Sequence, residues 1–180
     1  MADATGKSYV VLAGELVLRP LAMNRSGFFQ PPDQSQSVSF AVAHDGAGRE
    51  IAGGWHVYPE LAAAGLWSTP PDLARIILAM VAAQKGGNVA VLGADGLAAM
   101  LTSVDDLGYG LGVALQGEVR DRIAMKPGNN LGFRSGLCRL PRNGTGRPGW
   151  SNGQMPIAEG ARRPCGIVVV RASAGSLAAA

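Results

Sequence analysis

The two histidines are side chains whose types could support metal or acid-base chemistry. His44 and His56 lie on either side of an expected hairpin. A zinc site would need further ligands at suitable spacing, and the carboxylates of Asp45 and Glu60 are merely nearby in sequence. The pattern therefore favours solvated or hydrogen-bonded histidines, and we predict no metal site.

Serine nucleophiles of common hydrolases are recognised by a Ser-x-x-Lys or a Gly-x-Ser-x-Gly pattern, and the sequence contains neither. Ser135 follows a basic residue, Arg134, but this is not the arrangement of an activated nucleophile. The two cysteines, Cys138 and Cys165, fit neither a metal spacing nor a disulfide framework, so we interpret them as small buried residues. Taken alone, these residues supply no complete catalytic centre.

The segment 144–149 matches the letters of a dinucleotide-binding glycine loop. It lacks the preceding strand and the following helix that such a loop requires, and Pro148 interrupts it. We interpret the segment as a turn and predict no cofactor.

Composition excludes several protein classes. A chain of 180 residues that is 47% hydrophobic can close a core, while 26 glycines and 11 prolines imply many turns. The longest apolar runs, 76–83 and 167–170, are far shorter than a membrane span. The first residues lack the apolar core of a signal peptide, so we expect a cytoplasmic protein as written. A periplasmic or secreted location stays open if the N-terminus is missing.

Charge is distributed unevenly along the chain. Residues 1–100 carry 6 basic and 8 acidic residues, whereas residues 101–180 carry 10 basic and 5 acidic residues. A basic half could bind nucleic acid, but the arginines are scattered, without interleaved aromatic residues or a recognisable nucleic-acid motif. We therefore predict neither a nucleic-acid nor a membrane partner.

Three helices are expected from apolar spacing and from start and stop signals. The first spans 8–18 and ends before Pro20. The second begins with Thr69 as its cap and Pro70 in its first turn, with Asp72 reaching back to complete a capping box. It ends at Gly86-Gly87, and a shorter helix is expected from 95 to about 102.

Strands dominate the second half of the sequence. A short hairpin is expected at 38–51, around Asp45-Gly46, and period-two alternation predicts a strand over 109–116. A turn at Gly117-Glu118 leads to expected strands at 119–126 and 131–140. Helices followed by an antiparallel meander predict an α+β fold.

Four segments, in order, resemble the serine β-lactamase-related hydrolases, which include class C β-lactamases, D-alanyl-D-alanine carboxypeptidases and β-lactamase-fold esterases. Residues 55–75 contain Ala-Gly-Leu-Trp-Ser-Thr-Pro-Pro-Asp-Leu-Ala, which is similar to a characteristic segment of that family. The other three segments are 5–26, which contains Pro-Leu-Ala-Met; 109–113, Tyr-Gly-Leu-Gly-Val; and 126–135, from Lys-Pro-Gly to Gly-Phe-Arg-Ser. The resemblance implies the C-terminal part of the serine β-lactamase/penicillin-binding-protein-like fold, an antiparallel sheet with flanking helices, in incomplete form.

The resemblance also implies roles for individual residues. In the family, Ser-x-x-Lys supplies the nucleophile and a base, and Tyr-x-Asn a further acid/base group; neither occurs in this sequence. A third motif does occur: Lys126 corresponds to its cation and Gly128 permits close approach, while the amide of Asn129 would donate to an oxyanion. We also expect Tyr58 and Trp67 to contact substrate.

Some positions depart from the family pattern. Pro127 replaces a small residue of the third motif, and Ala22 replaces a glycine. Beyond residue 146 the expected apolar strand and covering helix are not recognisable, so we divide the chain into 1–146, the family-like part, and 147–180, a divergent, frame-altered or disordered tail. The missing strands would leave an open sheet edge through which the chain could associate with itself.

Two functions remain open at this stage. The first is a truncated serine hydrolase whose full-length relatives cleave esters, amides or β-lactams through an acyl-serine, inactive alone for want of a nucleophile. The alternative is a non-catalytic remnant or small binding domain that uses the same groove for a carboxylate-bearing ligand. We expect the isolated chain to show no hydrolysis above buffer.

Overall fold

A computed structural model describes residues 2–32, 40–87, 89–104, 108–118, 122–140, 145–151 and 170–171. Within these ranges the helices are α1 (Ala2–Thr5), α2 (Tyr9–Ala13), the π-helix η1 (Gly14–Leu18), α3 (Leu61–Ala64), α4 (Pro70–Gln84) and α5 (Ala94–Met100). The strands are β1 (Gly27–Phe28), β2 (Leu66–Trp67), β3 (Ala114–Gln116), β4 (Ile123–Asn130), β5 (Phe133–Leu140), β6 (Thr145–Ser151) and β7 (Val170–Arg171).

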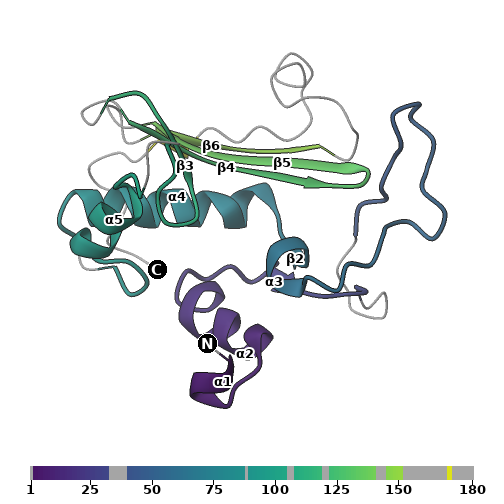
Figure 1. Ribbon diagram of the computed structural model, residues 1–180, viewed down its shortest axis with the longest axis horizontal. Coiled ribbons are helices and arrows are strands. Elements are labelled where there is room, and N and C mark those ends of the chain that lie inside the picture. Colours follow the sequence, from purple (N-terminus) through teal and green to yellow (C-terminus); the bar gives the residue numbers. More distant parts are fainter. Residues whose placement is uncertain are drawn as a thin grey trace.

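The main sheet has the order β3-β4-β5-β6-β7, and each described neighbour pair is antiparallel. Helix α4 runs beneath this sheet and packs against β6, β5 and β7 (Figure 1). The second sheet pairs only β1 with β2. The architecture is therefore a helix-backed antiparallel sheet, in agreement with the α+β fold expected from the sequence.

Helix α4 begins as the sequence indicates, because Thr69 caps it and Pro70 occupies its first turn. The Asp72 amide donates to Thr69 Oγ1 at 3.4 Å. The Asp72 carboxylate does not complete the capping box, however. It accepts hydrogen bonds from the Arg25 amide at 2.8 Å and from Ser26 Oγ at 2.7 Å. The buried carboxylate thus ties the start of α4 to a segment far away in sequence.

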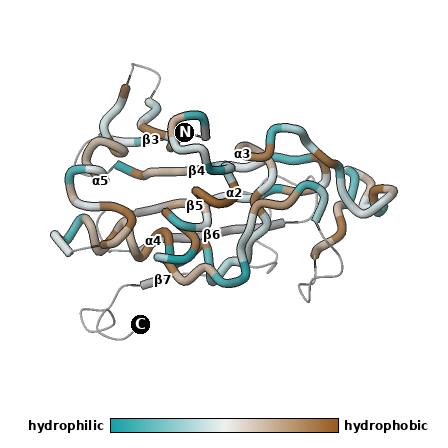
Figure 2. The backbone as a smooth tube through the Cα atoms, turned by 90° about the horizontal axis from the view of Figure 1, so that it is seen from below, coloured by the Kyte–Doolittle hydropathy of each residue, from teal (hydrophilic) through white to brown (hydrophobic). Residues whose placement is uncertain are grey.

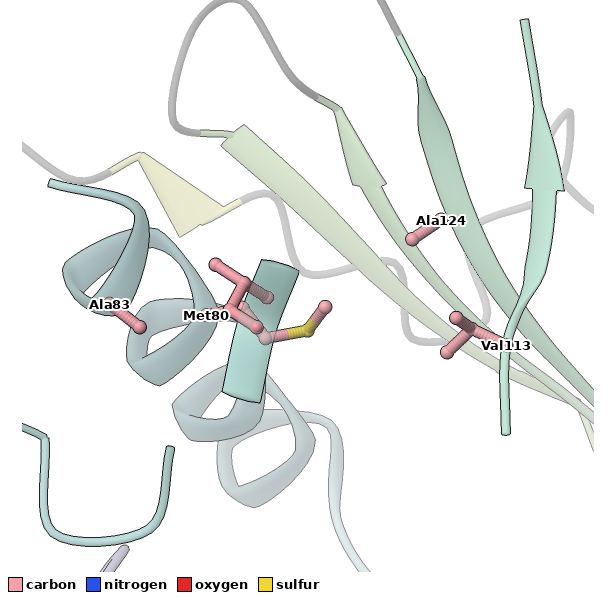
Figure 3. Close-up of a cluster of buried hydrophobic side chains, with 5 residues drawn as sticks. Met80, Ala83, Val113 and Ala124 are labelled. Atoms are coloured by element: carbon pink, nitrogen blue, oxygen red, sulfur yellow. The ribbon is translucent and has the colours of Figure 1, made fainter. Parts of the chain in front are cut away.

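A small apolar core joins α4 to the sheet. Five buried residues form one cluster: Met80 and Ala83 of α4, Leu97 of α5, Ala124 of β4, and Val113, which directly precedes β3. Figure 3 labels Met80, Ala83, Val113 and Ala124. Figure 2 shows α4 coloured mainly as hydrophobic, because residues 76–83 are apolar throughout, and each of them is buried or half-buried. This core holds the first half of β4 against α4.

The N-terminal helical segment agrees with the prediction for 8–18, with a local difference. Ser8 caps α2, and the last turns are a π-helix in which the Arg19 amide donates to Gly14 O. The chain then leaves the helix through Ala22, whose φ of 52° lies in the left-handed region. The predicted helix is thus present, and the alanine that replaces a family glycine occupies a conformation that favours glycine.

Two sequence interpretations were wrong. The period-two pattern of 109–116 yields a strand only at Ala114–Gln116, because Gly108 and Gly112 adopt φ of 75° and 76° and fold the preceding residues into a tight turn. Segment 144–149 was interpreted as a turn, but its described part lies in β6, which pairs with β5 along its length.

Other expectations held in part. The turn around Asp45 is present, with the Asp45 amide donating to Arg49 O at 2.9 Å, although its pairing is a single bridge between His44 and Glu50. Residues 38–39 and 119–121, parts of two expected strands, lie outside the described residues. Strand β6 crosses the expected boundary at 146, and the two-part division of the chain stays a prediction.

Among the described residues, no helix has the length and apolar character needed to cross a membrane.

Candidate ligand-binding site

A cavity of about 600 Å³ lies between β4, β5, α3, α4 and the loop that precedes α3. Its sheet side includes Lys126, Gly128 and Ser135, and its other side is formed largely by aromatic and aliphatic residues. A concave, mostly apolar space with a few polar groups is the usual form of a small-molecule site. Most of the candidate residues quoted above therefore meet in one place.

The third-motif residues lie on one strand at this cavity. Lys126, Gly128 and Asn129 all belong to β4 and line the space. Gly128 pairs with Ser135 on β5, and a Cβ on Gly128 would collide with Ser135 Oγ. The lack of a side chain at Gly128 thus lets Ser135 Oγ lie directly against β4 in this register.

The strand carries these residues beside an open edge. Strand β3 pairs with β4 only at Ile123, Ala124 and Met125, so β4 from Lys126 onward has a described neighbour on one side alone. Pro127 falls within this half, where a missing amide N–H removes no β3–β4 hydrogen bond. The same opening makes the peptide groups of this half accessible to a ligand.

The end of the β4–β5 hairpin is held by side-chain hydrogen bonds. The Leu131 amide donates to Tyr58 Oη at 2.8 Å, and Asn130 Nδ2 donates to Ala64 O at 3.0 Å. Gln30 links the same parts, because its Nε2 donates to Ala64 O and its Oε1 accepts from the Tyr58 amide, each at 3.3 Å. These bonds fix the hairpin relative to α3.

A glycine in the turn makes that arrangement possible. Gly132 has a φ of 77°, and a Cβ there would come within 2.6 Å of Ala43 Cβ and 2.9 Å of the His44 amide nitrogen. The turn therefore packs directly on the 43–44 backbone. The hairpin register, and with it the pairing of Gly128 with Ser135, depends on this two-residue turn.

Aromatic rings form one wall of the cavity. Trp67 makes edge-to-face contacts with Trp55, Phe133 and Phe40, with ring centroids 5.6, 5.5 and 5.0 Å apart. Trp55, Trp67 and Phe133 line the cavity and are half-buried. Tyr58 also lines it, although its hydroxyl already accepts the Leu131 bond. Both residues expected to contact substrate, Tyr58 and Trp67, thus border the same space as Lys126.

Charged side chains are few at the cavity. Lys126 and Glu60 are its lining residues with full charges, and both are exposed. Among the described residues, no ion pair within 4.0 Å involves either of them. His56 also lines the cavity, whereas His44 Nδ1 lies 3.1 Å from Val42 O. Lys126 is therefore available to an anionic ligand.

Sequence reasoning missed Trp55, Phe133 and Ser135 as cavity residues. Phe133 and Ser135 face the cavity because the two-residue turn sets the β5 register. The glycine at 132, between the two expected strands, was the sequence signal, since short hairpin loops with glycine fix register. Trp55 had no such signal, because its place depends on the packing of a loop.

Comparisons with known proteins place the chain in context. The profile of the beta-lactamase family matches residues 1–171. No curated protein sequence matches the chain. Among solved structures, an octameric penicillin-binding protein homologue from Pyrococcus abyssi is 22% identical, with a TM-score of 0.68 over 89% of this chain and 38% of that one.

Two further structures show the same fold. A class C beta-lactamase is 18% identical, with a TM-score of 0.70 over 89% of this chain and 51% of that chain. A D-amino acid amidase from Ochrobactrum anthropi SV3 is 19% identical, with a TM-score of 0.62 over 84% of this chain and 46% of that chain. This chain thus spans about half or less of each of these structures. On the family match and the shared α+β fold, the chain belongs to the beta-lactamase family.

Proposed function

We propose that this chain provides the carboxylate-anchoring side of a serine-hydrolase groove and that, by itself, it binds an ester, amide or β-lactam without hydrolysing it. The observation that carries the proposal is the position of Lys126 and Gly128, on the unpaired half of β4 and on the wall of the cavity. Lys126 supplies the cation for a ligand carboxylate, and Gly128 leaves the backbone open to the ligand.

The roles of the site residues follow from this placement. An amide of the open β4 edge, that of Asn129, would donate to the ligand carbonyl oxygen, as oxyanion-hole amides do. Tyr58 and Trp67 would border the ligand from the opposite wall. Amides are an appropriate ligand class because one structural neighbour is a D-amino acid amidase complexed with an amino acid amide.

Turnover needs a nucleophile that the printed sequence does not offer in a recognisable motif. Removing the nucleophile from a serine-hydrolase centre removes nearly all of its rate. Ser135 faces the cavity, but none of its described contacts includes a hydrogen-bonded base. The second candidate function, hydrolysis through an acyl-serine, therefore requires Ser-x-x-Lys and Tyr-x-Asn from a segment outside this sequence.

Two measurements on the purified chain test the proposal. A chromogenic cephalosporin and a p-nitrophenyl ester should be hydrolysed no faster than in buffer, and a fluorophosphonate probe should label no serine. Covalent labelling of Ser135 or any other serine would contradict the inactivity.

Binding is tested by NMR titration of the labelled chain with N-acetylglycine, a small carboxylate that carries an amide. Amide shifts are expected at Lys126, Gly128 and Asn129. Lys126→Met should weaken binding about tenfold, as expected for loss of one charge-assisted contact. The matched control is Lys85→Met, since Lys85 is exposed at the end of α4 and lies outside the cavity lining. Equal effects of the two variants would contradict the anchoring role.

A further inference from the structure

The helical segment formed by α2 and η1 carries a concentration of exposed apolar side chains. Of the nine large apolar side chains that are exposed among the described residues, four lie on this segment: Tyr9, Val10, Val11 and Leu16. In Figure 1 the segment lies below α4, on the side that faces away from the main sheet. Its second part, η1, is a π-helix, a rare form that occurs often at functional sites. Exposed apolar groups gathered in one place mark an interaction surface.

One row of residues along this segment has a gap in its middle. Val10, Gly14 and Leu18 are four residues apart, so they share one side of the helix, away from the buried Leu12. A Cβ built on Gly14 would meet no atom within 4 Å. Glycine lowers the stability of a helix, and no described neighbour requires it here. The gap between Val10 and Leu18 therefore suits the side chain of another helix that approaches closely.

The adjacent row carries charges of both signs. Val11, Glu15 and Arg19 follow one another at the same spacing, and Arg19 Nη2 lies 3.6 Å from Glu15 Oε1. The Arg19 side chain is 70% exposed and the Glu15 side chain 34%, so both can be reached from outside. The row reads apolar, acidic, basic. It is complementary in charge to a copy of itself that runs in the opposite direction.

Both rows fit a second copy in a single register. A two-fold axis perpendicular to the helix brings the same side of two copies together in opposite directions. With the axis between residues 16 and 17, Leu18 lies over the partner's Gly14, and Glu15 lies beside the partner's Arg19. An axis at Gly14 would instead bring the two Glu15 carboxylates together. Size and charge thus favour the same register.

From these features we infer that the α2–η1 segment is the interface through which this chain forms an antiparallel dimer with a second copy. One helix pair covers less than the about 800 Å² per partner of a standard interface, so the dimer is weak and reversible. The interface is separate from the ligand cavity and from the open edge of β4. The inference therefore does not depend on the proposed function.

Concentration-dependent measurements on the full chain test the association. Sedimentation equilibrium from about 10 µM to about 1 mM should show a reversible monomer–dimer equilibrium. NMR spectra over the same range locate the interface, because the backbone amide signals of residues 10–19 should shift with concentration. The signals of residues 126–130, on the open half of β4, should not shift. Shifts at 126–130 alone would assign the association to the sheet edge and overturn the inference.

Gly14→Gln tests the gap in the apolar row. The variant fills the gap with a side chain of good helix propensity, in space that no described neighbour occupies. As a monomer it should resist denaturant at least as well as the wild type. Its dimer should be about tenfold weaker, because the partner's Leu18 loses its place. A less stable monomer with unchanged association would show that Gly14 serves the fold alone.

Glu15→Arg and Arg19→Glu test the antiparallel orientation. Each variant alone places like charges opposite each other in the dimer and should weaken it about tenfold. An equimolar mixture of the two variants should recover most of the wild-type affinity, because each copy then meets opposite charges on its partner. The recovery has no explanation within one chain, since positions 15 and 19 of each variant keep like charges.

Arg49→Glu is the matched control for the charge changes. Arg49 forms a comparable ion pair with Asp45 at 2.8 Å, and its side chain is 81% exposed, outside α2 and η1. This variant should associate as the wild type does. Equal weakening by Arg49→Glu, a mixture that associates no better than either variant alone, or a monomer at every concentration would each overturn the inference.

Discussion

The hydroxyl of Tyr58 accepts a hydrogen bond from the backbone amide of Leu131 at 2.8 Å, across 73 positions of sequence. This bond connects the loop before α3 to the turn of the β4–β5 hairpin. The hairpin carries Lys126 and Gly128, so a residue expected to contact substrate also positions the strand that forms the site.

Tyr58→Phe tests this connection. The free energy of unfolding of the variant should be lower by about 1 kcal/mol, the usual net contribution of one hydrogen bond. The Leu131 amide should exchange with solvent faster. Denaturant unfolding and hydrogen exchange measure the two effects. Tyr109→Phe is the control, since Tyr109 is 56% exposed and its hydroxyl has no described partner. Unchanged exchange at Leu131 would contradict the connection.

Gly128 and Ser135 should be energetically coupled. Gly128→Ala places a methyl group against Ser135 Oγ and should destabilise the hairpin and weaken ligand binding. Ser135→Ala removes that oxygen, and the double variant should recover most of the stability, with a coupling of about 1 kcal/mol or more. Denaturant unfolding of the wild type, both single variants and the double variant measures the coupling. Additive single effects would show that the two residues do not face each other.

Asp72 should be important for stability away from the cavity. Its carboxylate accepts from the Arg25 amide and from Ser26 Oγ, and its side chain is 8% exposed. Asp72→Ala leaves the Arg25 amide without its partner and Ser26 Oγ with Ser68 Oγ alone, and it should lower the free energy of unfolding by about 2 kcal/mol. Asp95→Ala, at the exposed start of α5, is the comparison and should cost about 0.5 kcal/mol. Similar losses in thermal unfolding would contradict the prediction.

Position 22 should be more stable with glycine than with its present alanine. Its φ of 52° is a left-handed conformation that costs residues with a Cβ more than glycine. Ala22→Gly should therefore raise the free energy of unfolding by about 0.5 kcal/mol, after the greater freedom of the unfolded glycine is subtracted. Ala98→Gly, in α5, should lower it instead by about 0.5–1 kcal/mol. Destabilisation by both changes would rule out the left-handed conformation at Ala22.

Asp45 should titrate below its ordinary pKa. The hydrogen bond from the Arg49 amide is the largest cause, and the Arg49 side chain and the Ala47 amide lower the pKa further. Because the folded-state pKa is depressed, the carboxylate stabilises the turn above the unfolded-state pKa, and this contribution is lost as pH falls through the folded-state value. NMR titration of Arg49→Gln should retain most of the depression, since the backbone donors remain. A return to the ordinary pKa would assign the effect to the guanidinium.

Local signals in the sequence account for α4 and α5 and for the succession of β3, β4 and β5. Thr69 and Pro70 specify where α4 begins because the cap and the fixed proline φ act within one turn. The alternation of apolar residues predicted a strand at 109–113 where there is none. A period of two does not distinguish a strand from a segment that glycines with positive φ fold into a turn. The carboxylate of Asp72 could not be assigned from sequence either. The sequence pattern predicts that this carboxylate reaches back to Thr69. In the structure it binds donors that only tertiary packing brings near.

The sequence identified several residues of the site, but it did not predict the cavity that they line. Lys126 and Gly128 were identified through the resemblance to the family, and the structure places them at the cavity. The aromatic wall was not predicted, because Trp55 and Phe133 come together only when a loop and a hairpin pack on each other. Such contacts depend on side-chain packing between distant segments, which periodicity does not encode.

The early end of β3 divides β4 into two parts that natural variation should treat differently. Ala124 and Met125 are paired on both sides, and Ala124 belongs to the core, whereas Lys126 to Asn130 are paired on one side and line the cavity. In a complete substitution scan of the eight residues of β4, changes up to Met125 should mainly lower the amount of folded protein. Changes from Lys126 onward should mainly alter ligand binding. One part of β4 would then limit which substitutions the fold tolerates, and the other part could change its residues to bind a different ligand.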